Sequence, residues 1–156
     1  MEILFYCLER KSIEDILPGL LERTIERGWR AVVRTDSKER MNALDSHLWT
    51  WSDQSFLAHG TPDTGHPSEQ PVYLTTGEEN PNGSTVLFLA GGEMPSHWDA
   101  ARFPGYVRVV VLFNGQDTEL MAAASTSWRE AQACGHQAAF WRQNPAGKWE
   151  QDRLSP

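Results

Sequence analysis

The feature that most constrains the fold of this chain is the alternation of short apolar runs with segments of helical periodicity near its start. Residues 2–8, "EILFYCL", are mostly apolar and include two aromatic side chains, as expected of a buried strand. Between Ser12 and Gly28 the apolar residues recur at helical spacing instead. Ser12 and Asp15 stand in capping-box positions and Gly28 provides a stop, so this segment is predicted to be a helix.

The same order of elements repeats directly afterwards. The run "RAVVRT" at residues 30–35 predicts a second strand. Asp36 and Glu39 predict the start of a second helix, with Leu44 and Leu48 facing inward. A strand–helix–strand–helix order is typical of a parallel sheet with helices packed on its faces.

The rest of the chain continues this pattern without an internal repeat or a second domain. Residues 52–70 form a long connection rich in Ser, Asp, Gly, Pro and His. Further strands are expected at residues 71–76, 85–90, 106–113 and 136–143, and further helices at 96–103 and 117–134. We therefore predict an α/β, single-domain Rossmann-like fold over residues 1–143, with a mainly parallel sheet flanked by helices, and a C-terminal tail at residues 144–156.

Composition and charge narrow the class of function. Apolar residues make up 40% of the chain and charged residues 22%, as in ordinary globular proteins. The net charge of −7 argues against a protein that grips nucleic acid directly by its phosphates. No apolar run is long enough to span a membrane, and Cys7 and Cys134 alone make no disulfide framework, so we expect a cytoplasmic protein. Residues 128–156 carry four basic residues against three acidic ones, so an acidic partner is expected to bind there.

The turn after the first strand lacks the residues of a nucleotide site. A Rossmann-type cofactor site needs glycines there, so that the backbone can approach a pyrophosphate at a helix N-terminus. Here the turn reads "ERKS", and no phosphate-binding GxxxxGK[ST] motif occurs elsewhere. The sequence therefore predicts a Rossmann-like fold without the nucleotide-binding glycine loop and without a cofactor.

Polar side chains in the 47–66 segment are the candidates for chemistry. His47, Asp53, Ser55 and His59 are the residue types of a serine hydrolase, but no GxSxG elbow surrounds Ser55. The histidines and aspartates of this segment also lack the fixed spacing of a metal site, so no metal is expected. A small Rossmann-like hydrolase or nucleotide-using enzyme with its site in this loop stays as the alternative function.

The helix expected at residues 117–134 has one small-residue face. At 100° per residue this face gathers Leu120, Ala124, Ser127, Ala131 and Cys134. Trp128 lies at the edge of this face, and Arg129 lies nearly opposite it. Two interpretations follow: a tryptophan that seals the core beside a solvated arginine, or an aromatic shelf beside a cation, suited to a peptide that ends in an apolar side chain and a carboxylate.

Three motifs carry a family resemblance. "ALDSHLWTWSDQSFLAHG" contains a Leu-Trp pair at the end of the second predicted helix and then Ser-Phe-x-x-His, and "QPVYLTT" begins the next strand with Pro-Val. "WREAQACGH" places an aromatic and a basic residue before a glycine at the end of the last long helix. In this order the motifs resemble the DNA polymerase III chi subunit family, whose members are accessory proteins of the bacterial clamp loader.

The resemblance implies a replication adaptor without bound nucleotide or catalytic activity of its own. One surface is implied to accept the acidic, apolar C-terminal tail of the single-stranded-DNA-binding protein. By position that site falls on Trp128, Arg129 and Gly135, with Trp49 as a wall. Family members carry further basic residues one and two turns before the aromatic, where this chain has Ser125 and Met121. Either tail binding is weaker than in the family, or Arg142 and Lys148 supply the missing charge. We expect Trp128→Ala to remove tail binding and leave the thermal melt nearly unchanged.

A second surface is implied to meet the psi subunit or another second partner. Phe56 and His59 match the region associated with this contact. Here the family's Ser-Phe-x-Pro-His motif lacks its proline, because Ala58 precedes His59.

Overall fold

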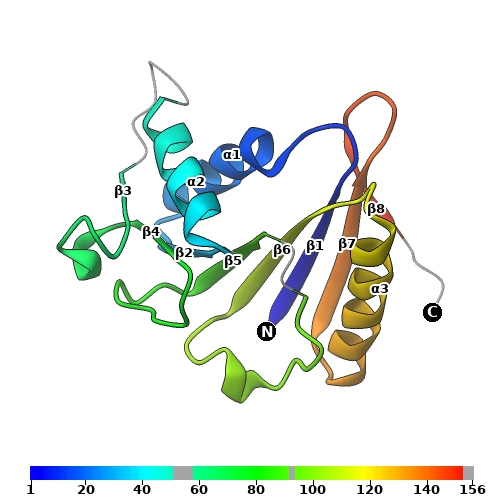
Figure 1. The fold of residues 1–156 in the computed structure, drawn as a ribbon. Coiled ribbons are helices and arrows are strands. Elements are labelled where there is room, and N and C mark those ends of the chain that lie inside the picture. Colours follow the sequence, from blue (N-terminus) through cyan, green and yellow to red (C-terminus); the bar gives the residue numbers. More distant parts are fainter. Residues whose placement is uncertain (51–57, 92–93, 153–156) are drawn as a thin grey trace.

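The computed structural model describes residues 1–50, 58–91 and 94–152. Within them the chain forms one eight-stranded sheet in the order β3-β4-β2-β5-β6-β1-β7-β8, with three α-helices packed on it (Figure 1). The elements are, in chain order, β1 (Glu2–Leu8), α1 (Ile13–Glu26), β2 (Ala31–Arg34), α2 (Lys38–Thr50), β3 (His59–Gly60), the 3₁₀ helix η1 (Pro67–Glu69), β4 (Val72–Thr75), β5 (Val86–Ala90), the 3₁₀ helix η2 (Ala100–Arg102), β6 (Arg108–Asn114), α3 (Thr118–Ala133), β7 (Gln137–Gln143) and β8 (Trp149–Asp152).

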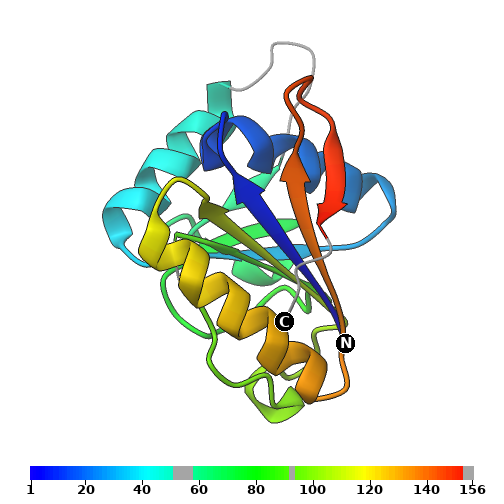
Figure 2. The same cartoon turned by 90° about the vertical axis from the view of Figure 1, so that its right-hand side faces the viewer.

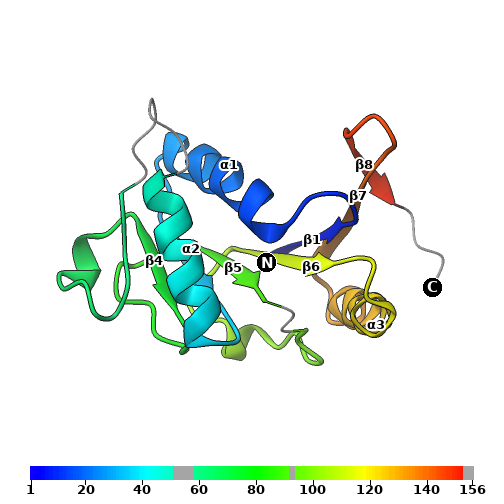
Figure 3. The same ribbon diagram turned by 45° about the horizontal axis from the view of Figure 1, so that its top comes forward.

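The sheet is parallel except at one edge. Every neighbouring pair from β3 to β7 runs parallel, and β7 and β8 pair antiparallel. The α1 and α2 helices cover one face of the sheet and α3 covers the other (Figure 3). The predicted α/β, Rossmann-like architecture with a mainly parallel, helix-flanked sheet is confirmed.

Alternating side chains of β1 show how the sheet divides the core. Ile3, Phe5 and Cys7 belong to the cluster under α3, whereas Leu4 and Tyr6 pack against the cluster under α1 and α2. This alternation follows from the two-residue period of a strand. A central strand with apolar residues on both faces is typical of a parallel sheet covered on both sides.

The predicted cap of α1 forms as expected. The Ser12 hydroxyl accepts from the Asp15 backbone N–H at 3.3 Å, and the Asp15 carboxylate accepts from the Ser12 backbone N–H at 3.0 Å. The backbone and side-chain hydrogen bonds from Ser12 lower the pKa of Asp15 below its usual value. Gly28 lies just after the helix with φ +79°, a conformation that a residue with a Cβ adopts only at a cost.

The C-terminal tail predicted to begin at residue 144 does not begin there. Residues 144–148 form a turn, in which the Asn144 side-chain oxygen accepts from the Ala146 and Lys148 backbone N–H groups. The turn returns the chain as β8, which pairs with β7 (Figure 2). Trp149 then packs edge-on against Tyr6, with 4.9 Å between ring centroids. The sheet therefore extends to residue 152, because an aromatic residue after the turn reaches the apolar surface of β1.

Smaller differences occur elsewhere. The helix expected at residues 96–103 is only the 3₁₀ turn η2, which Asp99 caps. The two-residue strand β3 lies within the long connection where no strand was expected. None of the helices in the described ranges is long and apolar enough to cross a membrane.

Candidate functional site

The two adjacent residues of the tail site predicted on α3 point in different directions. Trp128 is 8% exposed and belongs to the core cluster under α3. Its indole N–H donates to the Ala138 carbonyl of β7 at 3.3 Å. Arg129, the next residue, is exposed. Trp128 therefore seals the core and fixes α3 against the sheet, and it offers no aromatic shelf to a ligand.

The buried face of α3 matches the predicted one except at its C-terminal end, where Cys134 is the C-cap. Ala124, Ser127, Trp128 and Ala131 are its buried residues, and Cys134, predicted to be buried, is exposed. Hydrogen bonds hold the middle of this face: the Ser127 hydroxyl donates to the Pro95 carbonyl at 2.6 Å and accepts from the Trp98 indole N–H at 2.9 Å. Since Trp98 is itself fully buried, these polar contacts lie inside the core.

The other residues expected near Arg129 are spread over the molecule. Gly135 follows α3 with φ +84° and is exposed. Arg142 pairs with Glu9 and stands opposite Cys7 in the sheet register. The Cys7 sulfur is 4.0 Å from the sulfur of Met121, which is near the N-terminal end of α3. Arg142 therefore lies near that end of the helix, where the family's further basic residues are missing. Its guanidinium is already engaged by a carboxylate.

Trp49 lies on the opposite face of the sheet from Trp128. It occupies the last turn of α2, and its side chain is 54% exposed. Helix α2 packs against β3 and β4 at one edge, whereas α3 packs against β7, β1 and β6 toward the other. The sheet therefore separates Trp49 from Trp128 and Arg129, and the prediction that Trp49 forms a wall of the same site is wrong.

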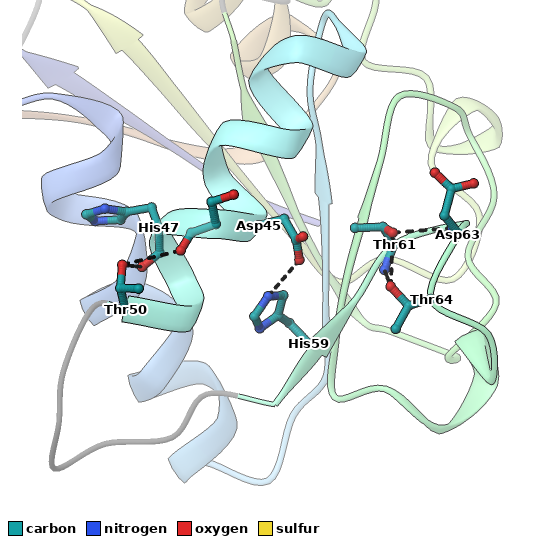
Figure 4. A network of polar contacts seen from close by, with 8 residues as sticks. Asp45, His47, Thr50, His59, Thr61, Asp63 and Thr64 are labelled. Atoms are coloured by element: carbon teal, nitrogen blue, oxygen red, sulfur yellow. Dashed lines mark hydrogen bonds and ion pairs between the residues drawn. The ribbon is translucent and has the colours of Figure 1, made fainter.

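His59 is a structural residue under Trp49. Its side chain is fully buried, and Nε2 lies 2.8 Å from an Asp45 carboxylate oxygen, as Figure 4 shows. The centroids of the His59 and Trp49 rings are 4.8 Å apart. His59 was predicted to belong to a partner surface, but the structure places it behind that surface, where it supports Trp49.

The structure describes only part of the 47–66 segment that holds the candidates for chemistry. Asp53, Ser55 and Phe56 lie outside the described residues. Thr61 and Thr64 form a local hydroxyl contact of 3.0 Å in the turn around Asp63 (Figure 4). Among the residues that the structure describes, no three His, Cys, Asp or Glu side chains gather as metal ligands would.

A basic groove on the α1 side was missed by the sequence analysis. Arg27 and Arg108 stack over the Trp29 ring, with their Cζ atoms 5.4 Å and 5.1 Å from its centroid. Arg23, Arg27, Trp29 and Arg108 line a cavity of about 110 Å³ with an apolar floor that includes Val110. We call these four residues the arginine–tryptophan groove.

The groove shows that positive charge is not confined to the C-terminal segment. The binding of an acidic partner at residues 128–156 stays a prediction, and the groove is a second basic surface outside that segment. Arg23 and Arg27 are four positions apart in the sequence, so helical spacing places them on one side of the chain, and the sequence alone could have shown this pair. Their proximity to Arg108 depends on the tertiary fold.

Comparisons with known proteins agree with this architecture. The family model described as "DNA polymerase III chi subunit, HolC" matches residues 1–139. A protein of Rickettsia prowazekii (strain Madrid E), described as "Probable DNA polymerase III subunit chi", is 31% identical over 70 residues, which are 45% of this chain and 42% of that protein.

A solved structure, that of the C-terminal domain of the DEAD-box protein Dbp5, is similar in fold. Its TM-score is 0.53 at 12% identity, with 89% of each chain covered. At this identity the likeness concerns the α/β fold alone. The family match, by contrast, extends over nearly the whole chain, and the protein therefore belongs to the DNA polymerase III chi subunit family.

Proposed function

We propose that this chain is a non-catalytic replication adaptor that binds the acidic C-terminal tail of single-stranded-DNA-binding protein and links it to the DNA polymerase III holoenzyme. The family match over residues 1–139 is the observation that carries this proposal. Two separate surfaces of the structure, one on α3 and one at the end of α2, suit the two contacts that an adaptor needs.

Arg129 is the centre of the proposed tail site. Its side chain is exposed on α3, and it makes no ion pair or hydrogen bond with the residues described. Less than one turn further along, Gln132 lines a cavity of about 370 Å³, whose lining combines the apolar Leu4, Ala138 and Ala139 with the polar Glu2, His136, Gln137 and Gln151. The acidic residues of the tail would meet Arg129, and its apolar last side chain would enter this cavity.

The electrostatics of α3 make Arg129 essential to this arrangement. The C-terminal end of a helix carries partial negative charge and repels a carboxylate. Arg129 provides the opposing positive charge near that end, and Gly135 leaves the surface beyond it without a side chain. An exposed ion pair of this kind is weakened by salt, so the affinity is expected to be on the micromolar scale and to fall as ionic strength rises.

The second proposed surface lies at the end of α2. Trp49 presents an exposed aromatic ring there, directly before the segment that contains Phe56. Exposed tryptophans are frequent anchors of protein interfaces, because one rigid ring buries a large area at a small entropy cost. We assign this surface to the psi subunit or another second partner.

Fluorescence polarisation with a labelled tail peptide tests the α3 site. Arg129→Glu is expected to weaken peptide binding by at least about tenfold and to leave the thermal melt unchanged, because the side chain is exposed. Arg27→Glu is the matched control, since it makes the same charge change in the arginine–tryptophan groove on the other face. Titrations at two salt concentrations check that the attraction is electrostatic.

The control also defines the result that contradicts the proposal. Loss of binding in Arg27→Glu with normal binding in Arg129→Glu would move the tail to the arginine–tryptophan groove. Normal binding in both variants would exclude both sites.

A further inference from the structure

A polar cavity lies on the α3 side of the sheet, beyond the part of that face that α3 covers. It measures about 610 Å³ and opens between the loop after β4 and the segment that contains η2. Its polar lining comes from Arg34, Asn80, Ser96, His97 and Arg102, with Glu78 at its edge. We call it the Arg34 cavity. None of its lining residues belongs to the proposed tail site or to the surface at the end of α2.

Arg34 is the least expected residue of this cavity. It is the last residue of β2, it points to the same face as Val32, and it is 8% exposed. Its Nε–H is buried without a hydrogen-bond partner, and within the described part of the chain no carboxylate forms an ion pair with it. A guanidinium does not lose its proton in a protein, so this buried charge persists, and Glu78, which lines the same cavity, forms no ion pair with it.

A second polar group beside Arg34 is also unsatisfied. The Tyr106 hydroxyl is buried and has no hydrogen-bond partner. Both residues line the cavity. Burial raises the pKa of Tyr106 to about 12, the positive charge of Arg34 opposes that rise, and the Glu79 carboxylate adds to it. Tyr106 therefore stays protonated at neutral pH and can donate a hydrogen bond.

Two orphaned donors in one cavity have a common physical explanation. Buried polar groups in folded proteins nearly always have partners, because an unmatched donor or charge destabilises the fold. An anionic group beside Arg34 would neutralise the guanidinium and would accept from both donors. Arg102 and His97 add polar donors at the rim of the cavity.

The rest of the lining determines the kind of molecule that fits. Met94, Pro95, Phe103 and Pro104 supply apolar surface next to the two donors. Cavities of about 300–1,000 Å³ are typical of small-molecule sites, and the largely polar lining of this one favours a charged ligand with a smaller apolar part. The volume exceeds the needs of a bare inorganic anion.

We propose that the Arg34 cavity binds a small organic anion, a phosphate monoester or carboxylate joined to an apolar group. The anionic group lies beside Arg34 and Tyr106, and the apolar group lies against Phe103 and Met94. This ligand site is independent of the proposed adaptor function, because it shares no residue with either partner surface.

Three probes separate the parts of this proposal: phenyl phosphate, inorganic phosphate and phenol, each titrated into the full-length protein. Binding is followed by calorimetry and by the shift in melting temperature. Phenyl phosphate is expected to bind saturably below millimolar concentration, more tightly than either inorganic phosphate or phenol. Benzoate is the corresponding carboxylate probe and shows which of the two anions the cavity prefers.

Two variants locate the site. Arg34→Met removes the buried charge and keeps an apolar side chain of similar length, so it is expected to abolish phenyl phosphate binding while the melting temperature of the unliganded protein stays equal or rises. Tyr106→Phe retains the ring and is expected to weaken binding several-fold. Arg27→Met, in the arginine–tryptophan groove, is the matched control and is expected to bind normally.

Three results would overturn the proposal. Absence of saturable binding by phenyl phosphate and benzoate at millimolar concentration would leave the cavity without this ligand class. Unchanged binding in Arg34→Met would place the ligand elsewhere. A large fall in the melting temperature of unliganded Arg34→Met, together with no ligand-induced shift in the wild type, would show that the arginine serves the fold alone.

Discussion

Trp128 and Trp49 are both near the C-terminal ends of amphipathic helices, but their side chains differ in exposure to solvent. Trp128 is 8% exposed and Trp49 is 54% exposed. The α3 helix lies over the seven-residue strands β1, β6 and β7, so a large ring on its inner side finds a complete apolar floor. The end of α2 reaches β3, a strand of only two residues, and the centroid of the Trp49 ring lies 4.8 Å from that of His59 in this strand.

The comparison separates two roles that the family resemblance had assigned to one site. A tryptophan over the wide part of the sheet stabilises the fold, whereas Trp49, over the short edge strand β3, is the residue that we propose for the second partner surface. Substitutions at these positions are therefore expected to affect different properties, and this expectation is the sharpest test of the assignment.

The largest effect is expected for Trp128→Ala. Removing a fully packed tryptophan from a core lowers the free energy of unfolding by about 3–5 kcal/mol. The loss of the hydrogen bond to Ala138 adds to the cavity that the ring leaves. Chemical denaturation measures this change. The thermal melt is thus expected to fall, contrary to the expectation from sequence, and an unchanged melt would contradict the burial of this ring.

Asp45→Ala is expected to have an intermediate effect on the surface under Trp49. It removes the carboxylate that lies 2.8 Å from Nε2 of the buried His59 ring, which destabilises by about 1–2 kcal/mol, toward the lower end of the range for charged partners because Asp45 is partly exposed. Denaturation of Asp45→Ala beside the exposed control Asp63→Ala measures the difference. Equal stability of the two variants would mean that the contact between Asp45 and His59 contributes nothing.

The smallest effect on stability is expected for Trp49→Ala, which should change the free energy of unfolding by less than about 1 kcal/mol because the ring is mostly exposed. The same variant is expected to lose association with the psi subunit, measured by size-exclusion chromatography of the mixed proteins. Tail-peptide binding should be retained. If Trp49→Ala lost tail binding instead, the two surfaces would not be independent.

Much of the fold was predictable because local signals and burial agree. The Ser12–Asp15 cap, the glycine stop at Gly28 and the apolar run of β1 each determine an element with little help from the rest of the chain. The β7–β8 hairpin was not predictable in this way. Its last strand has little apolar character of its own and forms because β7 offers hydrogen bonds and Tyr6 offers a surface for Trp149.

The candidate sites were also predictable only in part from the sequence. Sequence alone identified Arg129 as an outward-facing cation, because the helical period places it opposite a face of small residues. It could not decide whether the Trp128 ring was open to a ligand or buried in the core. A ring at the edge of that face becomes buried or exposed according to the width of the sheet below. Nor could it show that Arg34 and Tyr106, 72 residues apart in the chain, face one cavity.

By itself, then, the sequence determined the order of strands and helices, the parallel sheet and the family, because these depend on periodicity, caps and short motifs that are local in the chain. Only the tertiary structure decided which tryptophan is exposed, which arginines are paired, and where unsatisfied polar groups meet. These properties depend on contacts between segments distant in the chain, and burial, charge pairing and cavity shape exist only once those segments are packed together.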